Sequence, residues 1–338
     1  MLEQLPSWVH IGIAKGASSA LQKHYFATHP ELTSLGLGYQ QENISWYSPE
    51  IQIALEVDLR CRATHLYDAQ SIYNTYWSHV HRLWNNNQRY IGFSYENLSC
   101  SLGHDVSIAE KAYRLHQLLG TNTQIIYVVR DQITLLQSLY KELLLWGLPV
   151  PFDIWIERLI FTNFQGIISD LQYAEVIDTY AQLFGRDKMH IISFSQLQQN
   201  TSPTLHALST FLQISHSIDA LPTTHSGLTN IQAAWLLKQN QIHVHDFGRD
   251  RFAIWHGQRL HNFGRSQWSD WQPSEIIENQ QLGIESAKLA RQIEEGPTIE
   301  FNLSKHIREK LHHCFYKSNQ RLFDCYGVLF EDSVLQHE

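Results

Sequence analysis

The apolar residues of this chain follow two patterns that alternate along its length. Four short and nearly continuous apolar runs have the length of buried strands: residues 7–14, 89–94, 124–129 and 190–194. Between and after them, apolar positions recur at helical spacing over residues 18–27, 49–60, 69–84, 107–119, 132–146 and 173–184. The chain is therefore predicted to alternate strands with helices.

Two later helices carry recognisable end signals. They are predicted over residues 203–213 behind Ser202 as N-cap, and over residues 304–326 between Ser304 as N-cap and Gly327. A small hydroxyl residue before a helix accepts its first N–H groups, and glycine after a helix adopts the backbone turn that ends it.

The alternation predicts an α/β fold of P-loop type, with three α/β/α layers around a central, mostly parallel sheet. The chain is expected to form a single domain, residues 1–338. Its weakly patterned segment 225–300 is predicted to be a lid or an acceptor-facing insertion, with an irregular surface excursion as the alternative. Ligands bind such sheets at the carboxyl ends of the strands. The residues that follow predicted strand ends are Lys15, Glu96, Arg130 and Phe194.

Composition narrows the function further. The 338 residues are 43% hydrophobic and carry 25 Lys and Arg against 33 Asp and Glu, a net charge of −8. This balance argues against a nucleic-acid partner, so any anion site must be local. No run approaches the ~20 apolar residues of a membrane helix, and no signal-peptide pattern is seen. Four cysteines are too few for a disulfide framework. A soluble, cytoplasmic protein without a transmembrane segment is expected.

The candidate chemistry begins in the loop after the first run, Lys15-Gly16-Ala17-Ser18-Ser19-Ala20. Small residues before a helix can direct backbone N–H groups at a phosphate. A magnesium-dependent P-loop would have glycine at the positions of Val9 and Ala14, and Ser or Thr at that of Gly16. An acidic residue would also be expected at the strand end where Arg130 stands. The sequence therefore favours an anion bound without metal.

At this point the chain resembles a known family. Residues 15–22, followed by His29-Pro30, resemble the 5′-phosphosulfate loop of sulfotransferases that use 3′-phosphoadenosine 5′-phosphosulfate (PAPS). Residues 125–130, with Ser138 eight residues after Arg130, resemble the family's 3′-phosphate-binding segment. The likeness is nearest to bacterial and carbohydrate-type members. It departs from the family pattern at Ala17, which occupies a position usually held by glycine.

The resemblance implies a reaction and a set of roles. It implies PAPS as co-substrate, adenosine 3′,5′-bisphosphate (PAP) as product, no required metal, and a hydroxyl acceptor on a carbohydrate, other glycan or small metabolite. The candidate catalytic residues are Lys15, Glu96, Glu42 and Ser138. The candidate cofactor-binding residues are Lys15, Gly16, Ala17, Ser18, Ser19, Ala20, Arg130, Ser138 and Phe194. Lys15 would stabilise the leaving oxygen, Arg130 and Ser138 would bind the 3′-phosphate, and Phe194 would stack on adenine.

Each role has an ordinary alternative. Lys15 could be a solvated lysine, Ser18 and Ser19 N-capping residues, and Ser138 and Phe194 parts of a core. Arg130 could form an ion pair with Asp131 or Glu142.

The general base stays open between Glu96, which directly follows a strand, and Glu42, which lies shortly after the first helix; His65 and His104 are weaker candidates. Two other functions also stay open. One is a P-loop nucleotide or small-molecule kinase, and the other is a non-catalytic nucleotide-binding domain. The oligomeric state is left open.

Overall fold

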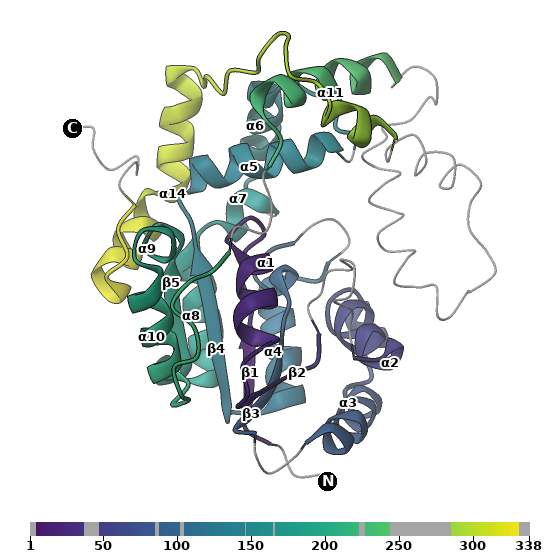
Figure 1. Cartoon of the computed structure of the whole chain (residues 1–338), viewed down its shortest axis with the longest axis vertical. Helices are drawn as coiled ribbons and strands as arrows, with labels where there is room; N and C mark the ends of the chain where they lie inside the picture. Colours follow the sequence, from purple (N-terminus) through teal and green to yellow (C-terminus); the bar gives the residue numbers. More distant parts are fainter. Residues whose placement is uncertain are drawn as a thin grey trace, which may run out of the picture. The chain divides into compact units, whose positions relative to one another are not determined.

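A parallel sheet forms the centre of the fold (Figure 1). The structure is a computed structural model that describes residues 5–36, 47–84, 88–101, 105–145, 147–164, 166–222, 227–243 and 285–330. The sheet of these residues has five strands in the order β2-β3-β1-β4-β5. Their bounds are β1 Ser7–His10, β2 Leu32–Ser34, β3 Tyr90–Ser94, β4 Thr123–Val129 and β5 Met189–Ser193.

All four pairings in this sheet are parallel. In the register around β1, Ser7 lies opposite Ile91 of β3 on one side and Thr123 of β4 on the other. The chain leaves β1 to build β2 and β3 on one side, and then crosses to build β4 and β5 on the other. The carboxyl end of β1 is therefore the point where the winding direction reverses, which is where open α/β sheets bind ligands. The predicted fold class is confirmed.

Gly92 lets β3 lie close to β1. A Cβ atom at this position would lie 1.8 Å from the carbonyl oxygen of Trp8, so any residue with a side chain would clash there. Trp8 itself is fully buried and stacks on Phe26, with ring centroids 4.4 Å apart. The glycine therefore lets a large aromatic residue occupy the central strand.

Helices cover both faces of the sheet (Figure 1). On one face α1 (Ser18–Leu21), η1 (Gln22–Phe26) and α10 (Thr201–Phe211) share an apolar core with Trp8 of β1 and with alternate residues of β4. On the other face α4 (Ile108–Leu119) and α8 (Tyr173–Phe184) pack together, and α8 contacts β4 and β5. Because β4 is buried along its whole length, it is apolar at nearly every position, as predicted.

The other helices agree with the predicted ranges or were not predicted. Those that were predicted are α2 Pro49–Gln52 continued by the π-helix η2 Ile53–Leu59, α3 Ala69–Leu83, α5 Gln132–Leu145 and α14 Lys305–Tyr326. Those that were not are η3 Thr64–Leu66, η4 Glu96–Leu98, α6 Phe152–Phe161, α7 Ile167–Asp170, η5 Arg186–Lys188, α9 Phe194–Gln199 and α11 Asn230–His243. Strand β2 was also not predicted.

One helix cap differs from the prediction. Helix α10 begins at Thr201 with Asn200 as N-cap, and the hydroxyl of Ser202 donates to Asp219 instead of capping the helix. The caps of the last helix are confirmed, because the Ile307 N–H donates to Ser304 Oγ at 3.2 Å and Gly327 has a φ of +68°.

The described residues divide into two compact units. The first comprises those of Met1–Asp131, Phe164–Thr224 and Cys314–Glu338, and holds the sheet. The second comprises those of Gln132–Asn163 and His225–His313, and holds α5, α6 and α11. In the second unit, Asn240 Nδ2 donates to the carbonyls of Leu144 and Leu148, which joins α11 to the end of α5. None of the helices in the described ranges combines the length and apolar character of a membrane span.

Candidate functional site

The loop between β1 and α1 takes a tight, irregular path. Its turn is closed by the Gly16 N–H, which donates to the carbonyl of Ile13 at 3.0 Å, and by Ser18 Oγ, which contacts the same oxygen at 3.3 Å. Lys15 and Ala17 both have left-handed backbone conformations, with φ of 68° and 63°. Such values are uncommon outside glycine, and they mark a loop whose shape is imposed by its surroundings.

Gly16 and Ala17 have different tasks in this turn. Gly16 does not have a positive φ; it is needed because a Cβ there would lie 3.0 Å from the Ile13 carbonyl oxygen. Ala17 adopts the left-handed conformation at the position where the family resemblance has glycine. Gly16 therefore does not replace the glycine that the family pattern has at position 17. Ala17 adopts the left-handed conformation itself, which is less favourable for alanine than for glycine.

Ser18, Ser19 and Ala20 follow at the start of α1. Ala17 is the N-cap and makes no side-chain cap bond, so the two serines do not cap this helix. Ser18 is buried and Ser19 half-buried. Their placement directly after the turn is the one that the phosphate-cradle hypothesis requires.

Arg130 reaches this loop from the end of β4. Its Nη1 donates to the carbonyl oxygen of Lys15 at 2.7 Å, and its guanidinium lies 4.4 Å from the ring centroid of Phe194 at the end of β5. Tyr173 holds the Arg130 backbone through a 2.6 Å hydrogen bond to its carbonyl. Burial lowers the pKa of Arg130, against the opposing influence of Tyr173 and Asp131. A partly desolvated guanidinium is stabilised by a nearby anion.

A buried polar group lies beneath the loop. His10 Nδ1 is 2.6 Å from Ser94 Oγ at the end of β3, and Gln22 Nε2 donates to the same hydroxyl at 3.0 Å. Burial lowers the pKa of His10 to about 3, so the ring is neutral at physiological pH. A Cβ on Gly12 would lie 2.8 Å from the His10 ring, so the loop rests directly on it.

The segment after β3 carries Glu96 and contacts the same loop. Glu96 opens η4 and is half-buried. Three residues later, Ser99 Oγ donates to the carbonyl of Gly12, and it also contacts the Glu96 carbonyl at 3.3 Å. The rival candidate base, Glu42, lies outside the described residues, as does His104.

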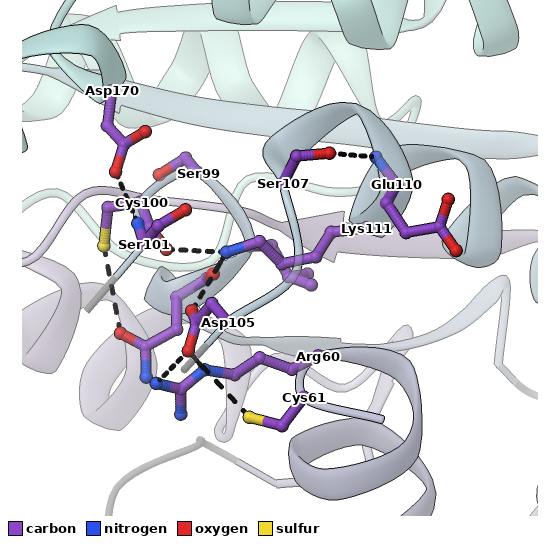
Figure 2. Close-up of polar contacts among 12 residues, drawn as sticks. Arg60, Cys61, Ser99, Cys100, Ser101, Asp105, Ser107, Glu110, Lys111 and Asp170 are labelled. Atoms are coloured by element: carbon purple, nitrogen blue, oxygen red, sulfur yellow. Dashed lines mark hydrogen bonds and ion pairs between the residues drawn. The ribbon is translucent and has the colours of Figure 1, made fainter. Parts of the chain in front are cut away.

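Three buried charged residues, here named the Asp105 cluster, lie behind this segment (Figure 2). Asp105 Oδ1 accepts from Arg60 Nε at 2.8 Å and pairs with Nη2 at 2.7 Å, and its Oδ2 accepts from Lys111 Nζ at 3.0 Å. The side chains are at most 3% exposed. In so dry a setting each charge depends on its partners.

The cluster is joined to the backbone after β3. Lys111 Nζ donates to the carbonyls of Asn97 and Cys100, both at 2.7 Å. The N–H of Ser101 donates to Asp170 Oδ2 at 2.5 Å, and burial raises the pKa of Asp170 to about 7. Sequence reasoning missed this network; its one local signal is that Lys111 lies on the apolar face of α4, four residues before Leu115.

The predicted site residues thus fall into three groups. The structure brings together Lys15, Gly16, Ala17, Ser18, Ser19, Ala20, Arg130 and Phe194 at the carboxyl edge of the sheet, with Glu96 on the adjoining segment. Ser138 is half-buried in α5 of the second unit, and its part in a 3′-phosphate site stays a prediction. Within the described residues, no group of three or more His, Cys, Asp or Glu could hold a metal ion.

One family model matches part of the chain. Residues 112–273 match the model of the sulfotransferase domain, a range that includes Arg130, Ser138 and Phe194 and begins after Lys15. No curated protein matches the chain.

Three solved structures are similar to the chain. A sulfotransferase from Alicyclobacillus acidocaldarius is 17% identical, with a TM-score of 0.45, over 66% of this chain and 86% of that one. The sulfotransferase domain of the curacin biosynthetic pathway is 15% identical (TM-score 0.35; 64% and 77% covered). The sulfotransferase domain of the Synechococcus PCC 7002 olefin synthase is 12% identical (TM-score 0.39; 93% and 96% covered).

Proposed function

We propose that this chain is a sulfotransferase that transfers a sulfuryl group from PAPS to a hydroxyl of a carbohydrate or another small metabolite, a proposal supported by the match of residues 112–273 to the sulfotransferase domain. The observation that carries the proposal is the hydrogen bond from Arg130 to the Lys15 carbonyl. It joins the end of β4 to the loop after β1, so two cationic residues belong to one edge of the sheet.

The proposed chemistry uses these groups in order. The acceptor oxygen attacks sulfur in line, the bond from sulfur to the bridging phosphate oxygen breaks, and PAP leaves with the negative charge. Lys15 and the N–H groups of Gly16 to Ala20 stabilise that charge. Arg130 binds the 3′-phosphate through its paired N–H groups, and Phe194 supports the guanidinium or the adenine ring.

The acceptor hydroxyl must lose its proton as the new bond forms. We propose that Glu96 accepts it, because Glu96 directly follows β3 and its segment contacts the loop of Lys15. A Glu96→Gln variant is then expected to bind PAP normally and to lose turnover.

The decisive experiment is isothermal calorimetry of the whole chain with PAP, ADP and ATP, without magnesium. We expect preference for PAP, and we expect Arg130→Ala to lose about 1.5–3 kcal/mol of PAP binding because a charge-assisted phosphate contact is removed. Sulfuryl transfer from PAPS, followed as PAP release in the presence of candidate acceptors, distinguishes an enzyme from a nucleotide-binding domain without turnover.

Arg186→Ala is the matched control. Arg186 also lies over an aromatic ring, that of Tyr326 at 5.2 Å, and it pairs with Asp178 at 3.7 Å, away from the loop. It should bind PAP as wild type does. A wild type that prefers ATP, or an Arg130→Ala variant with undiminished PAP affinity, would overturn the proposal.

A further inference from the structure

The loop that carries Lys15 is held from both of the strands that flank β1. From the β4 side, Arg130 donates to the carbonyl of Lys15. From the β3 side, Ser99 donates to the carbonyl of Gly12. Between these two points the loop closes on itself through Ile13. Two of its non-glycine residues, Lys15 and Ala17, have the left-handed backbone conformation, which is strained. The loop therefore depends on contacts from outside to keep this conformation.

Ser99 is itself held in a segment whose backbone carbonyls are unusually well occupied. Lys111 Nζ donates to the carbonyls of Asn97 and Cys100, and the hydroxyl of Tyr180 donates to that of Leu98 at 2.9 Å. The carbonyl of Glu96 accepts the N–H of Ser99 at 3.2 Å. Four of the five carbonyls from Glu96 to Cys100, all but that of Ser99, thus accept hydrogen bonds from α4, α8 or the segment itself.

The bonds from Lys111 constrain the backbone of this segment strongly, because the lysine is buried. Lys111 and Asp105 have no exposed side-chain surface, and Arg60 on the far side of Asp105 also donates to the hydroxyl of Tyr95 at 2.8 Å. A buried ammonium group is costly unless carboxylate and carbonyl oxygens accept its hydrogen bonds, so Lys111 holds the oxygens around it in place. The Asp105 cluster therefore holds the segment that presents Ser99 to the loop.

We propose that Ser99, held by Lys111, is a positioning residue for the loop that carries Lys15. Its hydroxyl fixes the Gly12 carbonyl, and so the direction in which the following N–H groups and the Lys15 side chain leave β1. This inference rests on the proposed function, since it assumes that the loop binds the PAPS phosphate. It adds a contact from outside the loop and outside the residues matched by the family model.

The test compares Ser99→Ala with Ser209→Ala. Both serines are buried and both hydroxyls contact backbone carbonyls, but the Ser209 hydroxyl bonds to Leu205 within α10 and to the Tyr25 hydroxyl of η1, and to no residue of the loop that carries Lys15. Kd for PAP is measured by calorimetry at a temperature where thermal unfolding shows each variant to be fully folded. We expect Ser99→Ala to bind PAP about tenfold more weakly, the value of one buried hydrogen bond, and Ser209→Ala to bind as wild type does.

A steady-state measurement adds a readout that lost stability would not move. Ser99→Ala should raise KM for PAPS while leaving KM for the acceptor unchanged. If wild type binds PAP but Ser99→Ala binds it equally well, or if Ser209→Ala is weakened to the same extent, the positioning role is refuted and the proposed function stands. If wild type itself does not bind PAP, the proposed function fails.

Discussion

Asp105→Asn is the substitution to which the first compact unit should respond most strongly. The change keeps the size of the side chain but removes the anion between Arg60 and Lys111. Both cations would remain at sites where their side chains are 3% and 0% exposed, with distances of 2.7 to 3.0 Å to the former carboxylate oxygens. Breaking a buried ion pair by removing one partner typically destabilises a protein by about 3–5 kcal/mol.

That loss is large beside a typical unfolding free energy of about 5–15 kcal/mol. At an m-value of about 3 kcal/mol/M, it would move the midpoint of urea unfolding down by about 1–1.7 M. Circular dichroism at 222 nm follows the transition. An unchanged m-value would show that the variant exposes the same surface area on unfolding as the wild type does.

Asp178→Asn provides the comparison. Asp178 pairs with Arg321 and Arg186, whose side chains are 47% and 63% exposed, so water replaces the lost partner. Its expected effect is below about 1 kcal/mol. If Asp105→Asn shifts the midpoint no more than Asp178→Asn does, the Asp105 cluster does not contribute the expected share of the unfolding free energy.

Two further predictions concern backbone strain and pH. Ala17→Gly relieves the strain of a left-handed alanine, which destabilises the folded state by about 1–2 kcal/mol. The glycine also raises the entropy of the unfolded chain, which opposes this gain by about 0.4–1 kcal/mol. Tm should therefore rise slightly, and a fall would contradict the assigned conformation. Burial lowers the pKa of His10 to about 3 and that of His190 to about 4, so each contributes stability above pH 6.5 that is lost on acidification by about 1.4 kcal/mol per pH unit. Asp170, with a pKa raised to about 7, acts oppositely: its contribution is present below pH 3.8 and is lost as the pH rises towards 7. Urea unfolding between pH 6.5 and 4 should therefore show a steeper acid loss in Asp170→Asn, and an unchanged slope would refute the Asp170 assignment.

The fold was predictable because its signals are local. The apolar run at residues 124–129 became β4, and the helical periodicity of residues 107–119 became α4. Strand β2 escaped prediction because it has three residues, of which only Leu32 is buried. A periodicity cannot be read from one apolar position.

The site was predictable only in part, for a similar reason. Lys15 and Arg130 follow strands, so topology alone brings their backbones to one edge of the sheet. Arg60, Asp105 and Lys111 are separated by long stretches of chain, and single charged residues are ordinarily solvated. Their partnership arises from the packing of η2 against α4, which no local pattern encodes.

The position of β1 at the middle of the sheet has a consequence for synthesis. This strand leaves the ribosome before the other strands of the sheet, yet Ser7 pairs with Ile91 and Thr123, which are made much later. At translation rates of about 5–20 residues per second, an apolar strand with both edges open would wait on the order of ten seconds for its neighbours. During that interval it is a target for chaperones and for pairing with other chains. The loop that carries Lys15 can take its final shape only after β4 has been made, because Arg130 at the end of β4 bonds to the Lys15 carbonyl.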